Sequence, residues 1–196
     1  MTSNIMNRRW LLESQIAQAW HDCISKDYSI QRINSERSLQ ASFWSRLNAL
    51  LSKNRRMFIE PCMTIKTNGH VRKIFPDLVI CNTREVIGIV ELKYMPRATP
   101  NYKKDINSLS IIAKHREHIT ISNERYRGQA VDKKIYTLSK SILFVWAGVH
   151  TGINSTIPKQ IDELPYSAGH KELEGCFIEL HAETNKNSGP KIYKRS

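Results

Sequence analysis

The segment Ser141–His150 (SILFVWAGVH) is a nearly continuous run of apolar residues. A strand with one face in water alternates apolar and polar side chains, whereas a strand covered on both faces is apolar throughout. The run is too short to cross a bilayer as a helix. It therefore predicts a buried strand, and the rest of the chain must supply elements that cover both faces of its sheet.

Helical patterns supply these covering elements. Residues Asn7–Cys23 have helical apolar spacing, and a second helix follows, capped by Asn34 or Ser35. A third helix is predicted over Tyr102–His118, upstream of the apolar run. Because a helix separates the run from the strands before it, we expect the run to pair in parallel with one of those strands.

Three strands are predicted between the second and third helices. They cover Met57–Lys66, Val71–Ile80 and Val86–Tyr94. Asn68–Gly69 is a strong hairpin signal, and Asn82–Arg84 forms a second tight turn. Consecutive strands joined by tight turns pair antiparallel, so this region predicts an antiparallel meander.

The remaining segments have weaker patterns. Ser122–Leu138 is polar and has no assignment, and Thr151–Gly175 is interpreted as a loop with one short helix. Cys176–Glu183 alternates and predicts a last strand, whereas the tail from Thr184 is expected to be frayed. The predicted fold class is α/β, a mixed β-sheet (an antiparallel meander plus a parallel strand) flanked by helices.

The chain is strongly basic, with 30 Lys and Arg against 18 Asp and Glu, a formal charge of +12. Such a charge favours a polyanionic partner through the release of counterions, but it does not separate nucleic acid from anionic lipid. Basic pairs recur along the whole chain: Arg55–Arg56, Arg72–Lys73, Lys103–Lys104, Lys133–Lys134 and Lys194–Arg195. This distribution indicates a folded basic surface rather than a basic tail.

Other global features exclude several classes. The four cysteines are widely spaced and form no CxxC pair, which argues against a zinc site and a disulfide framework. The sequence contains no P-loop and no GxGxxG string. The N-terminus lacks an apolar core of signal-peptide length, and no apolar stretch is long enough to span a bilayer. We therefore expect a cytoplasmic protein without a membrane segment.

Acidic and basic residues on two neighbouring predicted strands share one face of the sheet. Glu91 and Lys93 lie two residues apart on a strand, so their side chains point the same way. One of the two registers that the turn allows pairs Asp77 with Glu91, and cross-strand Cβ atoms are then about 5 Å apart. Two carboxylates that close repel each other unless a cation lies between them. The pattern therefore predicts a divalent metal site.

Mg²⁺ or Mn²⁺ would suit this site, because Mg²⁺ takes hard oxygen ligands and keeps several waters. The backbone carbonyl of Leu92 is a candidate third ligand. Lys93 would lie beside a water and a phosphate, where it can orient the water or offset developing charge. A structural salt bridge on a solvated face is the alternative, but charges within strands this apolar are costly unless paired or liganded.

Strand context, rather than the letters E-x-K, supports this prediction. Such a string is expected by chance roughly once or less in a chain of this length. Asp132-Lys133-Lys134 is another acid-x-Lys string, but it lies in a polar segment with no acid-bearing strand before it.

The strings FPDLVI and GIVELKY together resemble the core of the PD-(D/E)xK nuclease superfamily, which has the restriction-endonuclease-like fold. By length the chain is one domain over 1–196, and the resemblance places a nuclease core at about 35–150. An N-terminal helical extension (1–34) and a C-terminal extension (151–196) would flank that core. The resemblance implies Mg²⁺-dependent phosphodiester hydrolysis, with Asp77 and Glu91 as metal ligands and Lys93 as the catalytic lysine.

The resemblance also implies further site residues. The superfamily often has an acid on the helix before the meander, and Glu36 occupies that position, where a helix-dipole or capping role is an equal alternative. Glu60 is a weaker substitute. A basic residue on the following helix often touches the phosphate, and Lys103–Lys104 fits loosely, with a solvated basic pair as the alternative. Arg72–Lys73 is a further weak candidate for nucleic-acid binding.

The predicted function is thus a metal-dependent nuclease, an enzyme of the (deoxy)ribonuclease type with DNA rather than RNA as the expected substrate. A cut through both strands would require two active sites and hence a homodimer. The alternatives are a non-catalytic basic nucleic-acid-binding module on the same fold and an interaction protein whose Asp77 face is covered by another chain or by its own C-terminal segment.

Overall fold

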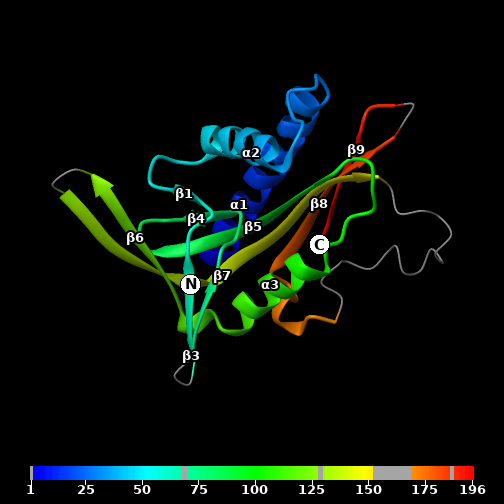
Figure 1. Ribbon diagram of the computed structural model, residues 1–196. Helices are drawn as coiled ribbons and strands as arrows, with labels where there is room; N and C mark the ends of the chain where they lie inside the picture. The colour runs from blue at the N-terminus through cyan, green and yellow to red at the C-terminus, as the bar shows by residue number, and fades with distance from the viewer. Residues whose placement is uncertain (1, 68–69, 128–129, 152–168, 186–187) are drawn as a thin grey trace.

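Strand β7 (Ala130–Thr151) forms the centre of the sheet, and its second half contains the apolar run. The computed structural model describes all residues except 1, 68–69, 128–129, 152–168 and 186–187, and the described strands form one nine-stranded sheet. The second half of β7 pairs in parallel with β5 (Glu85–Met95) on one side and with β8 (Phe177–Thr184) on the other. The expected parallel pairing with an upstream strand is therefore confirmed (Figure 1).

The predicted meander is antiparallel, but two of its three strands are interrupted. β1 (Arg56–Ile59) pairs with β4 (Leu78–Cys81), and β4 pairs with β5. The interruptions contain Pro61 and Pro76. Because proline has no backbone N–H to donate to a ladder, each proline ends the strand in which it falls.

The residues between the two interruptions form a separate hairpin. β2 (Met63–Thr67) pairs with β3 (His70–Ile74), and β2 also pairs with β6 (Ile119–Arg127). Thr67 faces His70, which agrees with a two-residue connection, although Asn68–Gly69 itself lies outside the described residues. The predicted single strands over 57–66 and 71–80 are each divided in two.

Helices cover both faces of the sheet (Figure 1). α1 (Thr2–Asp22), which continues into the π-helix η1 (Cys23–Tyr28), and α2 (Glu36–Leu50) cover one face. α3 (Lys103–Lys114), followed by the 3₁₀ helix η2 (Arg116–His118), covers the other. Each face has its own apolar core, because successive side chains of the central strands point to opposite faces.

The start of α2 is fixed by a capping box. The Ser35 hydroxyl accepts a hydrogen bond from the backbone N–H of Ser38, and the Ser38 hydroxyl accepts one from the N–H of Ser35. Of the two predicted caps, Ser35 is therefore the N-cap. This start places Glu36 in the first turn of α2, next to β5.

Two parts of the sheet differ from the sequence prediction. The unassigned segment 122–138 belongs to an antiparallel ribbon of β6 and the first half of β7. The side chains of Asp132, Lys133 and Lys134 lie outside the described residues. β9 (Lys191–Arg195) pairs with β8, so the expectation of a frayed tail from Thr184 is wrong. β9 is an edge strand rich in Lys and Arg, a composition that protects a sheet edge and weakens the apolar strand signal.

The predicted loop over 151–175 contains the 3₁₀ helix η3 (Lys171–Leu173), and its residues 152–168 lie outside the described residues. No helix in the described part of the chain is long and apolar enough to cross a membrane. The fold class is confirmed, because helices flank a mixed sheet in which an antiparallel meander adjoins parallel strands.

Candidate active site

Asp77 lies directly opposite Glu91 at the end of the β4–β5 ladder. The last pair of that ladder is Leu78 with Val90, and one further step places Asp77 against Glu91. The backbone N–H of Leu92 donates a 2.6 Å hydrogen bond to Asp77 Oδ2. Of the two registers that the turn allowed, the structure therefore contains the one that joins the two acids.

The main chain at Asp77 is held from two sides. Its carbonyl oxygen accepts a 3.1 Å hydrogen bond from the buried side chain of Gln40 on α2. The same oxygen accepts a 3.0 Å hydrogen bond from the backbone N–H of Glu60. Glu60, the weaker candidate for a third acid, thus contributes its backbone here, and its side chain is exposed. Asp77 is consequently anchored to α2 and to the segment after β1.

The carboxyl groups of Asp77 and Glu91 both have raised pKa values, and they interact with each other. Glu91 is only 9% exposed, and burial raises its pKa well above the usual range, with the charges of Asp77 and Asp105 adding to the effect. Burial also raises the pKa of Asp77, to about 6. A side-chain hydrogen bond between the two carboxyl groups raises the pKa of Glu91 and lowers that of Asp77. Without a cation, the pair therefore favours one charge rather than two.

The side chain of Lys93 points to the same face of the sheet as that of Glu91. There it contacts a third acid, which lies on α3. Its Nζ lies 3.8 Å from Oδ2 of Asp105, in the first turn of α3. Burial raises the pKa of Asp105, while the charge of Lys93 opposes that rise. The sequence prediction missed Asp105. The signal was present, since Asp105, Leu109 and Ile112 share one helical face and both apolar residues are buried.

Trp146, on β7, lies next to Glu91 and helps to hold Asp105 in place. It faces Glu91 in the β5–β7 register, and its Nε1–H donates a 3.4 Å hydrogen bond to Asp105 Oδ2. Gly148, opposite Lys93, has no side chain, and a Cβ atom there would overlap the indole ring. The indole therefore lies over Gly148 and supports the carboxylate that contacts Lys93. The sequence prediction identified neither residue as part of the site.

Glu36 lies at the exposed edge of the site. Its Oε2 accepts a 3.2 Å hydrogen bond from the backbone N–H of Tyr94 on β5, rather than from its own helix. The charge of Glu36 raises the pKa of both Asp77 and Asp105. Glu36 is thus close to the acid pair, as a metal-site role requires, and it also remains in the first turn of α2.

A divalent metal fits the donor set. No group of three or more His, Cys, Asp or Glu side chains in the described residues is already arranged to hold a metal. Mg²⁺, however, is commonly held by one or two carboxylates and waters. Asp77 and Glu91 supply two carboxylates. Since the N–H and C=O of a strand residue point to the same edge, the Leu92 carbonyl lies on the edge that faces Asp77.

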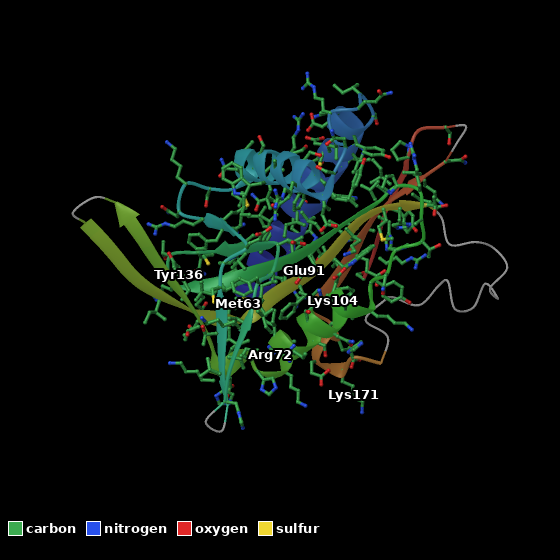
Figure 2. The ribbon with its side chains drawn as sticks, viewed as in Figure 1. Met63, Arg72, Glu91, Lys104, Tyr136 and Lys171 are labelled. Carbon is green, nitrogen blue, oxygen red and sulfur yellow. The ribbon has the colours of Figure 1, made fainter. Side chains whose placement is uncertain are left out.

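The basic candidates lie on two elements, α3 and β3. Lys103 and Lys104 are exposed in the first turn of α3, and the charge of Lys104 lowers the pKa of Asp105. Arg72 and Lys73 are exposed on β3, just before the segment that leads to Asp77. Figure 2 shows Glu91 at the middle of the sheet, with Lys104 on α3 and Arg72 on the projecting hairpin. In the described part of the chain, no hydrogen bond or ion pair joins these lysines and arginine to Asp77 or Glu91.

Comparisons with known proteins give limited information. No family model matches the chain, and no curated protein matches it. Among solved structures, the chain is similar to NucC of P. aeruginosa ATCC27853 in its cAAA-bound form, with 11% sequence identity and a TM-score of 0.42. The match covers 98% of this chain and 84% of NucC. A similarity at this level does not assign an activity, so the side chains of the site must indicate one.

Proposed function

We propose that the protein is a divalent-metal-dependent nuclease that hydrolyses phosphodiester bonds, with DNA as its substrate. The observation that supports this proposal is the pair of a partly buried Asp77 and a buried Glu91, with Lys93 on the same face as Glu91. Two acids that hold a proton in the absence of metal are a costly arrangement for a structural role alone. A bound cation would remove that cost.

Asp77, Glu91 and the Leu92 carbonyl would hold Mg²⁺ or Mn²⁺, with Glu36 as a further acid at the edge. When bound, the metal would polarise a phosphate oxygen and lower the pKa of a water. The ammonium group of Lys93 would offset negative charge that develops on the phosphate. Asp105 would orient Lys93, because the carboxylate lies 3.8 Å from the ammonium and is itself held by Trp146. We regard Asp105 as a positioning residue.

The basic surface supports a nucleic-acid substrate. The chain carries a formal charge of +12, and Lys103–Lys104 on α3 and Arg72–Lys73 on β3 are exposed. These groups would bind phosphates away from the cut bond and position the strand. The choice of DNA over RNA follows from the resemblance of the two strings to the PD-(D/E)xK superfamily. A cut through both strands would need two copies of the chain.

Cleavage assays on purified protein test this proposal. Supercoiled, linear and single-stranded DNA, with RNA for comparison, are incubated with EDTA, Mg²⁺ or Mn²⁺. We expect metal-dependent cleavage that Asp77→Asn, Glu91→Gln and Lys93→Met each abolish. Glu117→Gln and Lys114→Met, which change exposed residues away from the acids, are the matched controls and should cut normally. Circular dichroism establishes that each variant is folded. Equal cleavage by all five variants would refute the assignment.

A non-catalytic nucleic-acid-binding module is the second candidate. It is favoured by the engagement of Lys93 with Asp105 and by the lack of a ready three-side-chain metal group among the described residues. This function predicts binding with a steep salt dependence and no cleavage of DNA or RNA with either metal. The Asp77→Asn and Glu91→Gln variants would then bind as well as the wild type.

A further inference from the structure

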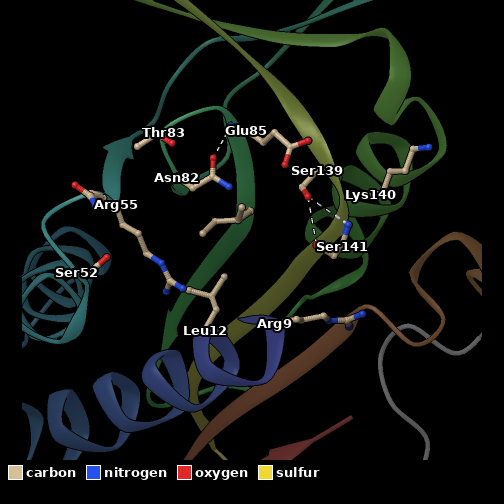
Figure 3. Close-up of a pocket in the computed structure, with 12 residues that line it drawn as sticks. Arg9, Leu12, Ser52, Arg55, Asn82, Thr83, Glu85, Ser139, Lys140 and Ser141 are labelled. Carbon is tan, nitrogen blue, oxygen red and sulfur yellow. Dashed lines mark hydrogen bonds between the residues drawn. The ribbon is translucent and has the colours of Figure 1, made fainter. Parts of the chain in front are cut away.

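A cavity of about 730 Å³ lies at the turn end of the β4–β5 hairpin (Figure 3). Its walls come from α1, the loop between α2 and β1, the β4–β5 turn and the middle of β7. Small-molecule sites typically enclose about 300–1,000 Å³. The cavity is therefore large enough for a ligand of the size of a nucleotide.

An irregularity in β7 opens this cavity. The β5–β7 register shifts between Val86, which faces Leu138, and Gly88, which faces Leu143. Residues 139–142 of β7 thus stand opposite the single residue Ile87 and bulge out of the ladder, and three of them line the cavity. Bulges of this kind are common next to functional sites, where they redirect side chains.

Arg55 is the principal cation of the cavity. Burial lowers its pKa, so the guanidinium is partly removed from water. Its one side-chain hydrogen bond in the described part of the chain is to Gln15 Oε1, at 2.7 Å, and no carboxylate pairs with it there. A guanidinium carries five N–H donors. A partly buried cation whose donors are mostly unused by protein acceptors is suited to an external anion.

The remaining charges favour an anion with more than one negative charge. Arg9 and Lys140 lie at the rim, and Glu85 is the acidic residue of the lining. The lining of the cavity therefore contains three cationic residues and one carboxylate. The planar fork of arginine matches phosphate oxygens in a bidentate manner. Hydroxyl groups of Ser52 and Ser139 add hydrogen-bonding capacity to the walls.

We propose that this cavity binds a small phosphate-bearing ligand, with Arg55 as the anchor of its phosphate. The site is distinct from the candidate active site. It lies on the face covered by α1, whereas Glu91 and Lys93 face α3. Along β5, Ile87 and Glu91 are four residues apart, or roughly 13 Å. A phosphate held by Arg55 is therefore not the phosphate that the acid pair would act on.

Calorimetric titration of the full chain with pyrophosphate and with ADP tests this proposal. The titrations are made in metal-free buffer, so that no divalent ion at Asp77 and Glu91 holds the phosphates. We expect both probes to bind the wild type and Arg55→Met to weaken binding by about tenfold or more, since a charge-assisted bidentate contact is lost. Arg84→Met, which removes an exposed charge from the neighbouring turn without lining the cavity, should change the affinity by less than about twofold.

Two further measurements separate the role of the Arg55 guanidinium from that of its partner, and a small ligand from a nucleic-acid backbone. Gln15→Leu removes the partner of Arg55 but keeps the guanidinium, so it should still bind the probes. A short single-stranded DNA oligonucleotide tests whether the phosphates come instead from a nucleic-acid backbone. Any of four results would overturn the proposal. The folded wild type could fail to bind both probes, or Arg55→Met could bind them as well as the wild type does. Arg84→Met could lose as much affinity as Arg55→Met, or only the oligonucleotide could bind in an Arg55-dependent manner. None of these results depends on cleavage activity.

Discussion

Asp77 accepts a hydrogen bond from the backbone N–H of Leu92, the residue between Glu91 and Lys93. One acid is thus fixed to the strand that carries the other two functional groups. The bond holds the two acids next to each other. Burial raises the pKa of both acids, and the charge of Asp77 adds to the rise for Glu91. Several measurable consequences derive from this arrangement.

Asp77→Asn should stabilise the metal-free protein at pH 8. The pKa of Asp77 is about 6 in the folded protein and 3.8 in the reference state, so the folded state binds the proton more tightly. Stability contributed by this group is therefore lost as pH rises through that window. We expect the variant to gain on the order of 1–2 kcal/mol at pH 8 and nothing at pH 3.5. Urea denaturation at both pH values measures this, and a variant less stable than wild type at pH 8 would contradict it.

Metal binding should release a proton from Glu91. Its pKa lies well above the usual range, and a carboxylate must lose its proton to bind a metal. At pH 7 we expect Mn²⁺ binding to release roughly one proton per ion. Calorimetry in two buffers of different ionisation enthalpy measures this number. Glu91→Gln should abolish the dependence on buffer, and a wild-type binding enthalpy that is independent of buffer would show the expectation to be wrong.

Asp105→Asn should reduce turnover without weakening substrate binding. The loss of its charge leaves Lys93 without the carboxylate that orients it. We expect kcat to fall about tenfold to a hundredfold, as for a misplaced catalytic group. KM should stay equal or fall, because removal of an acid favours a polyanion. Steady-state kinetics on a DNA substrate separates the two constants. A rise in KM with unchanged kcat would instead indicate a role in binding.

Gly148→Ala should destabilise the fold. Its Cβ atom would overlap the indole ring of Trp146, which is fully buried in the core. We expect a loss of about 1–3 kcal/mol in the free energy of unfolding. Gly189→Ala is the matched control, since no heavy atom lies within 4 Å of the added Cβ, and it should change stability by less than about 0.5 kcal/mol. Equal effects of the two substitutions in denaturation experiments would disprove the overlap.

The buried histidine network should make the protein less stable in mild acid. His150 Nδ1–H donates to the Thr151 carbonyl at 2.8 Å, and His150 Nε2 lies 3.0 Å from His181 Nδ1. Burial lowers the pKa of His150 below 6.5, so the unfolded chain binds the proton more readily. Stability must then fall as pH drops from about 6.5. His150→Gln should flatten this slope between pH 5 and 6.5, whereas the exposed control His118→Gln should not.

The sequence was sufficient to predict those strands and turns that local residue patterns determine. The apolar run at 141–150 predicted the central strand, and the turn at Asn82 predicted the hairpin that joins Asp77 to Glu91. The strand pattern did not predict the division of the meander, which Pro61 and Pro76 cause because proline has no backbone N–H to donate to a ladder. β9 was missed because its stability comes from pairing with β8 rather than from its own composition.

The rest of the candidate site depends on contacts between distant segments. Asp105 reaches Lys93 only because α3 packs on the face toward which Glu91 points. Trp146 reaches Asp105 only because β7 pairs in parallel with β5. Helical spacing places Asp105 on the buried face of α3, but which side chains that face meets depends on the tertiary arrangement. The cavity around Arg55 was unpredicted for the same reason.

The parallel pairing of β5 with β7 also sets when the site can form during synthesis. One edge of β5 is completed only by residues 143–150, which are translated after α3 and β6. Until they leave the ribosome, Glu91 and Lys93 lie on an unfinished edge, and the indole that supports Asp105 is absent. A nascent chain therefore contains Asp77 and Glu91 before it can complete the site around them, so any activity would begin only after residues 143–150 have been made.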